Sequence, residues 1–279
     1  MTGSGPRESE AATGAGRLAG KAAVVVGAGQ TEGETVGNGR ATALTFARQG
    51  ARLLLVDRDE GSVAATRDAI VAEGGQAEIH VADISRAEDC QQLVARAVTV
   101  LGRLDILHNN VGIGAGDARP ADLEPDVWDR ILDVNLKAMW QTCKWAVPVM
   151  RDQGGGAIVN ISSLAAVAAA NSLTAYKVSK AGVNALTQVL ATTYARHGIR
   201  ANAIMPGLID TPMGVDAAAA ARGMSRQDLA EARARAVPMR HQGTAWDIAN
   251  AALFLASDEA AFITGVLLPV DGGQAAMVG

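Results

Sequence analysis

Tyr176 and Lys180 lie four positions apart in the stretch AYKVSKAGVNAL, so on a helix their side chains share one face. A free tyrosine has a pKa of about 10, too high for a good base at neutral pH. A nearby ammonium group favours the phenolate. Ser163 precedes Tyr176 by thirteen residues and ends an expected strand. These residue types would suit proton transfer at a hydroxyl group, although a Tyr-x-x-x-Lys pair alone is common on solvated helix faces.

The stretch VVVGAGQTEGETVGNGRATALTFARQGARLLLVD has the outline of a nucleotide-binding strand–turn–helix–strand unit. Gly27 and Gly29 follow the first apolar run, and Gly37 and Gly39 precede the helix. Glycines let the backbone approach a pyrophosphate, and the helix N-terminus favours the anion. On this stretch alone, a glycine-rich surface loop without a ligand stays an alternative.

Two registers compete for the glycine turn. One uses Gly27, Gly29 and Gly33, which would place Gly37 and Gly39 inside the helix. Each interior glycine costs about 1 kcal/mol relative to alanine. We therefore favour the register in which Gly27, Gly37 and Gly39 are the functional glycines, with extra loop between them.

Asp57 ends the second apolar run, where an acid can accept hydrogen bonds from the adenosine ribose. Its carboxylate would repel a 2′-phosphate, which favours NAD over NADP. Arg58 follows directly and could help to bind NADP, so NADP stays possible.

Apolar runs alternate with helical patterns along the chain. The strands and helices that they predict would position these residues. Most of the apolar runs are continuous, as in parallel strands covered on both faces. The expected strands are 22–27, 52–57, 77–82, 104–109, 156–162, 199–205 and 264–269. The expected helices are near 39–49, 60–73, 86–101, 125–152, 175–197 and 245–256. This order predicts an α/β fold, a doubly wound Rossmann-type parallel sheet of about seven strands with helices on both faces.

Residues 207–242 break this rhythm and follow the strand 199–205. They combine Pro212, a polyalanine run, a charged helical piece and Pro238. An irregular segment of this length is often a lid or binding loop, so we expect a substrate-binding loop here.

The amino-acid composition limits the classes of protein to which this chain can belong. Of the 279 residues, 49% are hydrophobic and 19% charged, which permits a large core, and a net charge of −4 gives no basic surface for nucleic acid. Cys90 and Cys143 have no paired spacing, which fits a reducing cytoplasm. The four histidines lack metal-ligand spacing, and no stretch is long enough for a membrane span. We expect a flexible tail at 1–17, a single domain at 18–279, no metal, no nucleic acid and no membrane.

From about residue 18 to about 275 the chain resembles the single-domain branch of the short-chain dehydrogenase/reductase family. The matching pieces are Gly27/Gly37/Gly39, Asp83, NNVG at 109–112 (usually NNAG in the family), Asn135 in VNLKA, Ser163, Tyr176, Lys180, PGLIDTPM at 206–213 and the closing ITGVLLPVDGG. Their order and spacing make the match very specific.

The resemblance implies an NAD(P)-dependent oxidoreductase acting on CH–OH groups, commonly a homotetramer. Tyr176 would be the general acid/base, and Lys180 would hold the nicotinamide ribose and favour the phenolate. Ser163 would orient the substrate oxygen, and Asn135 would hold a water that links Lys180 to solvent. The expected cofactor-binding residues are Gly27, Gly29, Gly37, Asn38, Gly39, Asp57, Arg58, Asp83, Ile84, Asn109, Gly112, Tyr176, Lys180, Pro206, Gly207, Ile209 and Thr211.

The family has three residues between its first two glycines, whereas residues 28–36 separate Gly27 from Gly37, so six are extra. TEGETV, residues 31–36, is most simply an insertion beside the cofactor. Glu32 and Glu34 would repel a pyrophosphate, so we predict that both point to solvent.

The sequence predicts a cytoplasmic NAD-dependent enzyme that interconverts a secondary alcohol and a ketone. Residues 164–173, the segment after Gly112 and the 207–242 loop would bound the pocket, and Ala, Leu and Val after Ser163 suggest an uncharged, fairly apolar substrate. An NADPH-dependent 3-oxoacyl-thioester reductase and a catalytically silent cofactor-binding protein are the alternatives.

Overall fold

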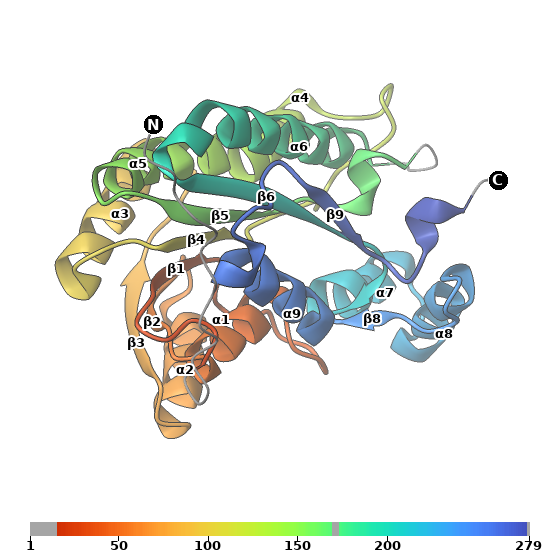
Figure 1. Cartoon of the computed structure of the whole chain (residues 1–279). Helices are drawn as coiled ribbons and strands as arrows, with labels where there is room; N and C mark the ends of the chain where they lie inside the picture. Colours follow the sequence, from red (N-terminus) through yellow and green to blue (C-terminus); the bar gives the residue numbers. More distant parts are fainter. Residues whose placement is uncertain (1–15, 169–172, 278–279) are drawn as a thin grey trace.

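Seven parallel strands form the central sheet of the computed structural model, which describes residues 16–168 and 173–277. The strand order is β3-β2-β1-β4-β5-β6-β9 (Figure 1). The strands are β1 (Ala22–Val26), β2 (Arg52–Asp57), β3 (Gln76–Val81), β4 (Ile106–Asn109), β5 (Gly156–Ile161), β6 (Ile199–Pro206) and β9 (Leu267–Val270). The predicted doubly wound sheet is therefore confirmed. The order reverses between β1 and β4, and the carboxyl ends of strands at such a point form the usual ligand crevice.

The central strands are buried on both faces, as their continuous apolar runs predict. In β1, Val24 and Val26 belong to one hydrophobic cluster, whereas Ala23 and Val25 belong to another on the opposite face. The five central strands of the sheet, β2, β1, β4, β5 and β6, thus each contribute to two cores.

Helices cover both faces of the sheet (Figure 1). One cluster joins the sheet to α3 (Ala87–Leu101), α5 (Ala138–Asp152) and α6 (Thr174–Tyr194). The other joins it to α1 (Asn38–Arg48), α2 (Glu60–Ala72) and α9 (Ala245–Ala256). Thr244 and Asp247 form a capping box at the start of α9.

The helix expected at 125–152 contains a π-helical turn. It consists of α4 (Pro125–Leu132), a π-helical turn (Asp133–Lys137) and α5. The extent predicted for the helix is therefore confirmed, and the π-helical turn within it carries Asn135, whose side chain is fully buried.

The segment 207–242 is more regular than expected. It contains the short strand β7 (Ile209–Asp210), a π-helical turn (Pro212–Asp216), α7 (Ala217–Arg222) and α8 (Arg226–Ala236). β7 pairs in parallel with β8 (Gly243–Thr244), outside the main sheet (Figure 1).

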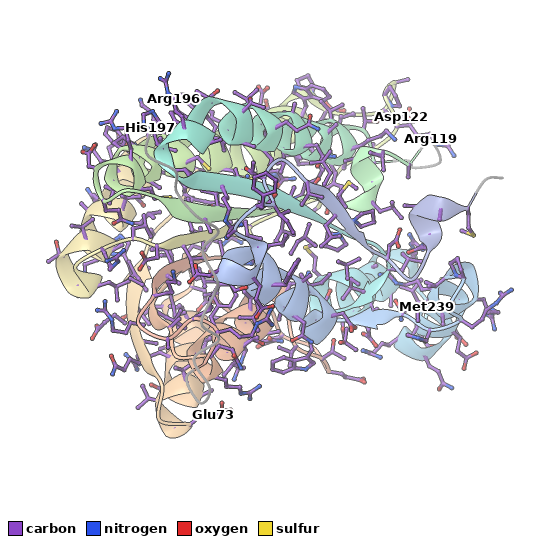
Figure 2. All side chains as sticks on the ribbon, viewed as in Figure 1. Glu73, Arg119, Asp122, Arg196, His197 and Met239 are labelled. Atoms are coloured by element: carbon purple, nitrogen blue, oxygen red, sulfur yellow. The ribbon has the colours of Figure 1, made fainter. Side chains whose placement is uncertain are left out.

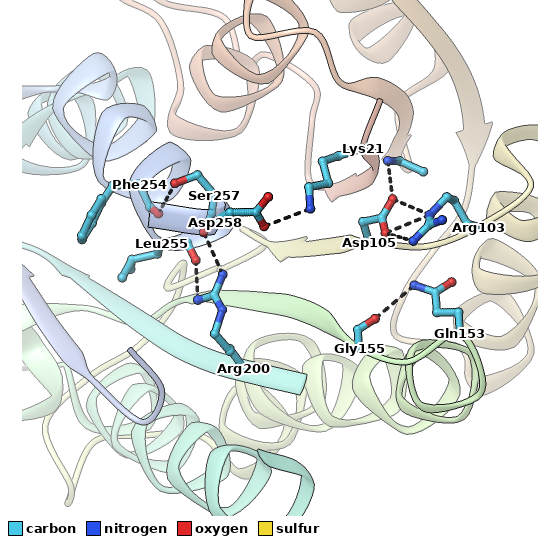
Figure 3. A network of polar contacts seen from close by, with 11 residues as sticks. Lys21, Arg103, Asp105, Gln153, Gly155, Arg200, Phe254, Leu255, Ser257 and Asp258 are labelled. Carbon is cyan, nitrogen blue, oxygen red and sulfur yellow. Dashed lines mark hydrogen bonds and ion pairs between the residues drawn. The ribbon is translucent and has the colours of Figure 1, made fainter. Parts of the chain in front are cut away.

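The amino ends of the strands are held together by a polar network (Figure 3). Asp105 accepts a 2.9 Å hydrogen bond from the Ala22 N–H and pairs with Arg103. Arg200, at the start of β6, donates to the carbonyls of Leu255 and Ser257 at the end of α9. These charged groups stabilise the fold at the amino ends of the strands. The crevice lies at the opposite, carboxyl ends.

The expected flexible tail falls almost wholly on residues 1–15, which lie outside the described residues. Within the described ranges, no helix has the length and apolar character needed to span a membrane.

Candidate active site

The glycine turn lies directly after β1. Gly27 has a φ of +79°, in the left-handed region that glycine tolerates. A Cβ atom on Gly39 would lie 1.8 Å from the Gly27 carbonyl oxygen, so α1 begins in direct contact with the turn. Asn110, after β4, donates a 3.0 Å hydrogen bond from Nδ2 to the same oxygen. The turn, the helix start and the end of β4 therefore form one packed unit at the crevice.

The start of α1 fits an anionic group. Gly37 is the N-cap residue and supplies no side-chain hydrogen bond, and the first turn has no acidic residue. The buried Oδ1 atom of Asn38 has no hydrogen-bond partner among the described residues, and because an amide oxygen only accepts hydrogen bonds, it suits a hydroxyl group of a ligand and not a phosphate. Helix-start N–H groups of this kind suit the phosphates of a dinucleotide. Because α1 begins at Asn38, Gly37 and Gly39 lie at its start, which supports the register with Gly27, Gly37 and Gly39.

Asp57 lies at the end of β2 beside the glycine turn. Its Oδ2 atom accepts a 2.9 Å hydrogen bond from the Gly29 N–H. A Cβ atom on Gly29 would lie 2.7 Å from that oxygen, so the close approach requires glycine. Arg58, the next residue, is exposed. The carboxylate thus braces the turn at the position where the sequence placed a ribose acceptor.

The other cofactor-binding residues expected after β3 and in β4 differ in their burial and in their hydrogen bonds. Asp83 is exposed, and hydrogen bonds from Ser85 lower its pKa. Ile84 is buried in a core cluster. The Asn109 side chain is also buried, with a 2.9 Å hydrogen bond to Asn160 Oδ1 and a second from Thr142. A cofactor contact of Asn109 would therefore have to use its backbone.

The expected cofactor-binding residues after β6 pack against, or form hydrogen bonds with, other residues of the protein. Pro206 is the last residue of β6, and the Gly207 N–H donates to the Val270 carbonyl over 3.0 Å. Ile209 is buried in a core cluster. The Thr211 hydroxyl accepts from the Gly214 N–H over 3.1 Å. These residues shape the base of the 207–242 segment.

The insertion forms a closed loop. Gln30 donates a 2.8 Å hydrogen bond to the Thr35 carbonyl and accepts a 2.9 Å bond from the Gly37 N–H. Glu32 and Glu34 are both exposed, which confirms the prediction that they face solvent.

The insertion also contacts the 207–242 segment, which the sequence did not indicate. Arg226, at the start of α8, lies 2.6 Å from Asp210, 3.3 Å from Asp216 and 3.5 Å from Glu34. The Glu34 N–H donates to Asp216 over 3.4 Å. One guanidinium therefore links the loop after β1 to Asp210 and Asp216 in the segment that begins after β6.

Tyr176 and Lys180 lie one turn apart near the start of α6. Lys180 is 1% exposed, and its Nζ atom donates a 2.8 Å hydrogen bond to the Ile161 carbonyl at the end of β5. Burial lowers the pKa of Lys180 to about 8. Burial raises the pKa of Tyr176, and a hydrogen bond with the Ser163 side chain opposes that rise. The structure thus brings together the hydroxyl, phenol and ammonium groups singled out in the sequence.

Ser163 and Asn135 complete this group. Ser163 follows β5 and also accepts a 3.1 Å hydrogen bond from the Ala165 N–H. Asn135 exchanges two hydrogen bonds with the backbone of Ile113, of 2.7 and 2.9 Å, and donates to Ser179 over 3.0 Å. A Cβ atom on Gly112 would lie 3.0 Å from Lys180 Nζ. The segment after β4 is therefore fastened beside α6 by Asn135.

Three residues near the site were missed in the sequence. Asn110 holds the glycine turn and lies inside the NNVG motif, which could have signalled it. Arg226 pairs with Glu34, and Asp117 accepts a 2.7 Å hydrogen bond from the Tyr176 N–H, both across long stretches of chain, so nothing in their spacing marks them. Among the described residues, no group of three His, Cys, Asp or Glu side chains could hold a metal ion.

A family model described as Enoyl-(Acyl carrier protein) reductase matches residues 34–275. A 3beta-hydroxysteroid dehydrogenase 2 of Eggerthella lenta is 36% identical over 260 residues, covering 93% of this chain and 96% of the relative.

Two solved structures share the fold over nearly the whole chain. A putative short-chain dehydrogenase/reductase from Burkholderia xenovorans is 41% identical with a TM-score of 0.87, covering 95% of this chain and 100% of that chain. A carveol dehydrogenase from Mycobacterium avium in complex with NAD is 30% identical with a TM-score of 0.86, covering 94% and 100%. The chain belongs to the short-chain dehydrogenase/reductase family and is an oxidoreductase of that type.

Proposed function

We propose that the protein is an NAD-dependent dehydrogenase that interconverts a secondary alcohol and a ketone. The observation that carries this proposal is the grouping of Ser163, Tyr176 and Lys180. Tyr176 shares a hydrogen bond with Ser163, and its ring centroid lies 5.8 Å from the buried Lys180 Nζ atom. A phenol held between a hydroxyl and an ammonium group is suited to exchange a proton with an alcohol oxygen.

Each of the four polar side chains of this site would have its own role in the reaction. Tyr176 would take the alcohol proton during oxidation and return it during reduction. Lys180 would favour the phenolate by its charge, which counters the effect of burial on the Tyr176 pKa. Ser163 would hold the substrate oxygen in line with the phenol. Asn135 would keep the segment after β4 against Lys180 and hold a water near it.

NAD would lie in the crevice between the carboxyl ends of β1 and β4. When bound, it would supply the hydride acceptor. Asn38 and Gly39 would bind its phosphates through their N–H groups at the start of α1, where Gly37 carries no side chain that could block their approach, and Asp57 would accept a hydrogen bond from the adenosine ribose. Support for NAD comes from the Asp57 carboxylate and from the neighbour solved with NAD.

An uncharged, largely apolar substrate is the finer part of the proposal. Leu164, Ala165, Ala166 and Val167 follow Ser163, and Val167 is 56% exposed. One relative is named for a hydroxysteroid and one solved neighbour for carveol. We infer a pocket bounded by 164–173, the segment after Gly112 and the 207–242 loop, although 169–172 lie outside the described residues.

We also propose one dehydrogenase domain over 18–279, a cytoplasmic location and a homotetramer. Both cysteines are free and buried, as in a reducing compartment. Trp140 is 46% exposed on α5, beside a hollow of about 410 Å³ lined mostly by apolar residues such as Leu136 and Leu186. Such exposed apolar surface is typical of a subunit contact, and elution of the protein as a monomer from a sizing column would count against it.

A panel of secondary alcohols with NAD or NADP tests the proposal, with reduced nicotinamide followed by absorbance. We expect NAD to be reduced, and Tyr176→Phe to lower kcat by about 10²- to 10⁴-fold while NAD binding is largely retained. Full activity of that variant would refute the role of Tyr176. Activity with NADP alone would support the 3-oxoacyl-thioester reductase alternative. Cofactor binding without turnover of any alcohol or thioester would support a silent cofactor-binding protein.

A further inference from the structure

The N-terminus of α6 is capped by a residue from another part of the chain. Asp117 lies in the segment between β4 and α4, 59 residues before Tyr176. Its Oδ1 atom accepts hydrogen bonds of 3.1 Å from the N–H groups of Thr174 and Ala175. Its Oδ2 atom accepts a 2.7 Å hydrogen bond from the N–H of Tyr176 itself. One carboxylate thus binds three N–H groups of the first helical turn.

Helix caps are usually local. The first N–H groups of a helix have no partner within it, and a Ser, Thr, Asp or Asn at the N-cap normally binds one of them. The N-cap residue of α6 is Leu173, whose side chain has no such acceptor. The distant Asp117 carboxylate therefore performs the task that a local residue performs in other helices.

A second contact fixes the same two segments. The Thr174 hydroxyl donates a 2.7 Å hydrogen bond to the Ala118 carbonyl, next to Asp117. The Asp117 Oδ1 atom also accepts a 2.9 Å bond from the Ala118 N–H, which orients the carboxylate. The cap is therefore held in place from both sides.

The capping segment also lies against the reactive side chains. The capping segment consists of residues 112–118. At its first residue, Gly112, a Cβ atom would lie 3.0 Å from Lys180 Nζ. At Gly114, a Cβ atom would lie 3.5 Å from Cδ2 of the Tyr176 ring. Asn135 holds the start of the segment through Ile113. Asp117 thus closes a link between the segment that packs on Tyr176 and the helix turn that carries it.

Tyr176 is the third residue of α6, inside the turn that frays first when a cap is lost. Lys180 lies one turn further and has its own anchor on the Ile161 carbonyl. Loss of the cap would therefore move the phenol relative to Ser163 while Lys180 stays in place. A displacement of about 1 Å at a reacting group can cost about 10²-fold in rate.

We propose that Asp117 is a positioning residue for Tyr176, acting through the first turn of α6. The inference rests on the proposed dehydrogenase function, because that function makes the place of the phenol matter. It assigns Asp117 no contact with substrate or cofactor.

The test compares Asp117→Ala with Asp117→Asn, which keeps one acceptor oxygen. Asp122→Ala is the matched control, because it removes the same charge from an exposed position in the same segment (Figure 2). We expect kcat to fall about 10- to 100-fold in Asp117→Ala, with the dissociation constant of NAD changed less than twofold. Asp117→Asn should recover a large part of that loss, and Asp122→Ala should match the parent.

Amide hydrogen exchange gives a readout independent of turnover. The N–H groups of 174–176 should exchange at least several-fold faster in Asp117→Ala than in the parent, while those near Lys180 are unchanged. Unchanged exchange in this turn, or faster exchange with an unchanged kcat, would overturn the inference. An equal loss of kcat and of NAD affinity would also overturn it, since that pattern marks a general structural defect. A parent inactive on every alcohol would refute the proposed function instead, and the exchange result would still test the cap.

Discussion

The Nζ atom of Lys180 lies 5.8 Å from the centroid of the Tyr176 ring, one turn further along α6. The same atom donates a 2.8 Å hydrogen bond to the Ile161 carbonyl at the end of β5. Lys180 is 1% exposed, and burial lowers its pKa to about 8, so the side chain is still mostly charged at neutral pH. A charge in a buried site is weakly screened by water. The sheet therefore holds a cation next to the phenol.

Lys180→Met should lower kcat/KM for alcohol oxidation by about 10²-fold or more at neutral pH. The methionine keeps a similar length but removes the charge that favours the phenolate, so the rise of kcat with pH should move to higher pH. A pH profile of kcat checks this. Lys144→Met, an exposed lysine of α5, is the control. An unchanged pH profile in Lys180→Met would show that the charge does not act on Tyr176.

Asp57→Asn should weaken the preference for NAD over NADP by about 10-fold or more. The asparagine oxygen can still accept the 2.9 Å hydrogen bond from Gly29, but the charge that repels a 2′-phosphate is gone. Asp57→Ala removes the brace as well and should weaken the binding of both cofactors. Fluorescence titrations with NADH and NADPH measure the ratio. An equal ratio in the parent and in Asp57→Asn would assign the selectivity to other residues.

Features set by neighbouring residues were predictable from the sequence. The central strands followed from continuous apolar runs, and the start of α1 near Gly39 followed from the glycines that precede an apolar-periodic stretch. The grouping of Ser163 with Tyr176 and Lys180 followed from a resemblance carried by several motifs together. In each instance the signal lies within a short stretch or an ordered set of stretches.

Features set by distant contacts were not predictable. No Gly or Pro marks the π-helical turn at Asp133–Lys137, whose Asn135 side chain bonds to Ile113 and Ser179 in other segments. The Asp117 cap and the ion pairs of Arg226 likewise join residues that only the folded sheet brings together. A single sequence carries no local trace of such contacts.

Arg226→Met should loosen the contact between the insertion and the 207–242 segment. The guanidinium lies between Asp210 and Asp216, and its removal leaves two partly buried carboxylates without that countercharge. We expect faster proteolysis within 207–242 and a loss of about 1–2 kcal/mol in the local free energy of opening. Arg235→Met is the control, because that arginine is 71% exposed and pairs only at 3.8 Å with Glu231.

Glu34→Gln should have a smaller effect than Arg226→Met, below about 0.5 kcal/mol. Glu34 is 74% exposed and lies 3.5 Å from the guanidinium, and exposed ion pairs contribute little. Limited proteolysis and urea unfolding of both variants measure which substitution destabilises the segment more. A larger effect of Glu34→Gln than of Arg226→Met would mean that the insertion, and not the aspartate pair, supports the segment.

His108→Leu should make the protein less sensitive to acid. The His108 ring is fully buried against Phe46, with a centroid distance of 6.0 Å, and burial lowers its pKa to about 3. Neither ring nitrogen has a hydrogen-bond partner among the described residues. An unfolded histidine has a pKa of about 6.5. Between these two pKa values the unfolded chain binds one more proton at this residue, so stability is lost as pH falls.

The free energy of unfolding of His108→Leu should therefore exceed that of the parent by a margin that grows below about pH 6.5. The growth is at most about 1.4 kcal/mol per pH unit for one proton. Urea unfolding of both proteins at several pH values measures the difference, in which the contributions of all other groups, including His80, cancel. His241→Leu is the control, because His241 is exposed, and its difference from the parent gives the baseline for replacing a histidine by leucine. A margin that stays constant with pH would mean that His108 does not titrate differently in the folded and unfolded chains.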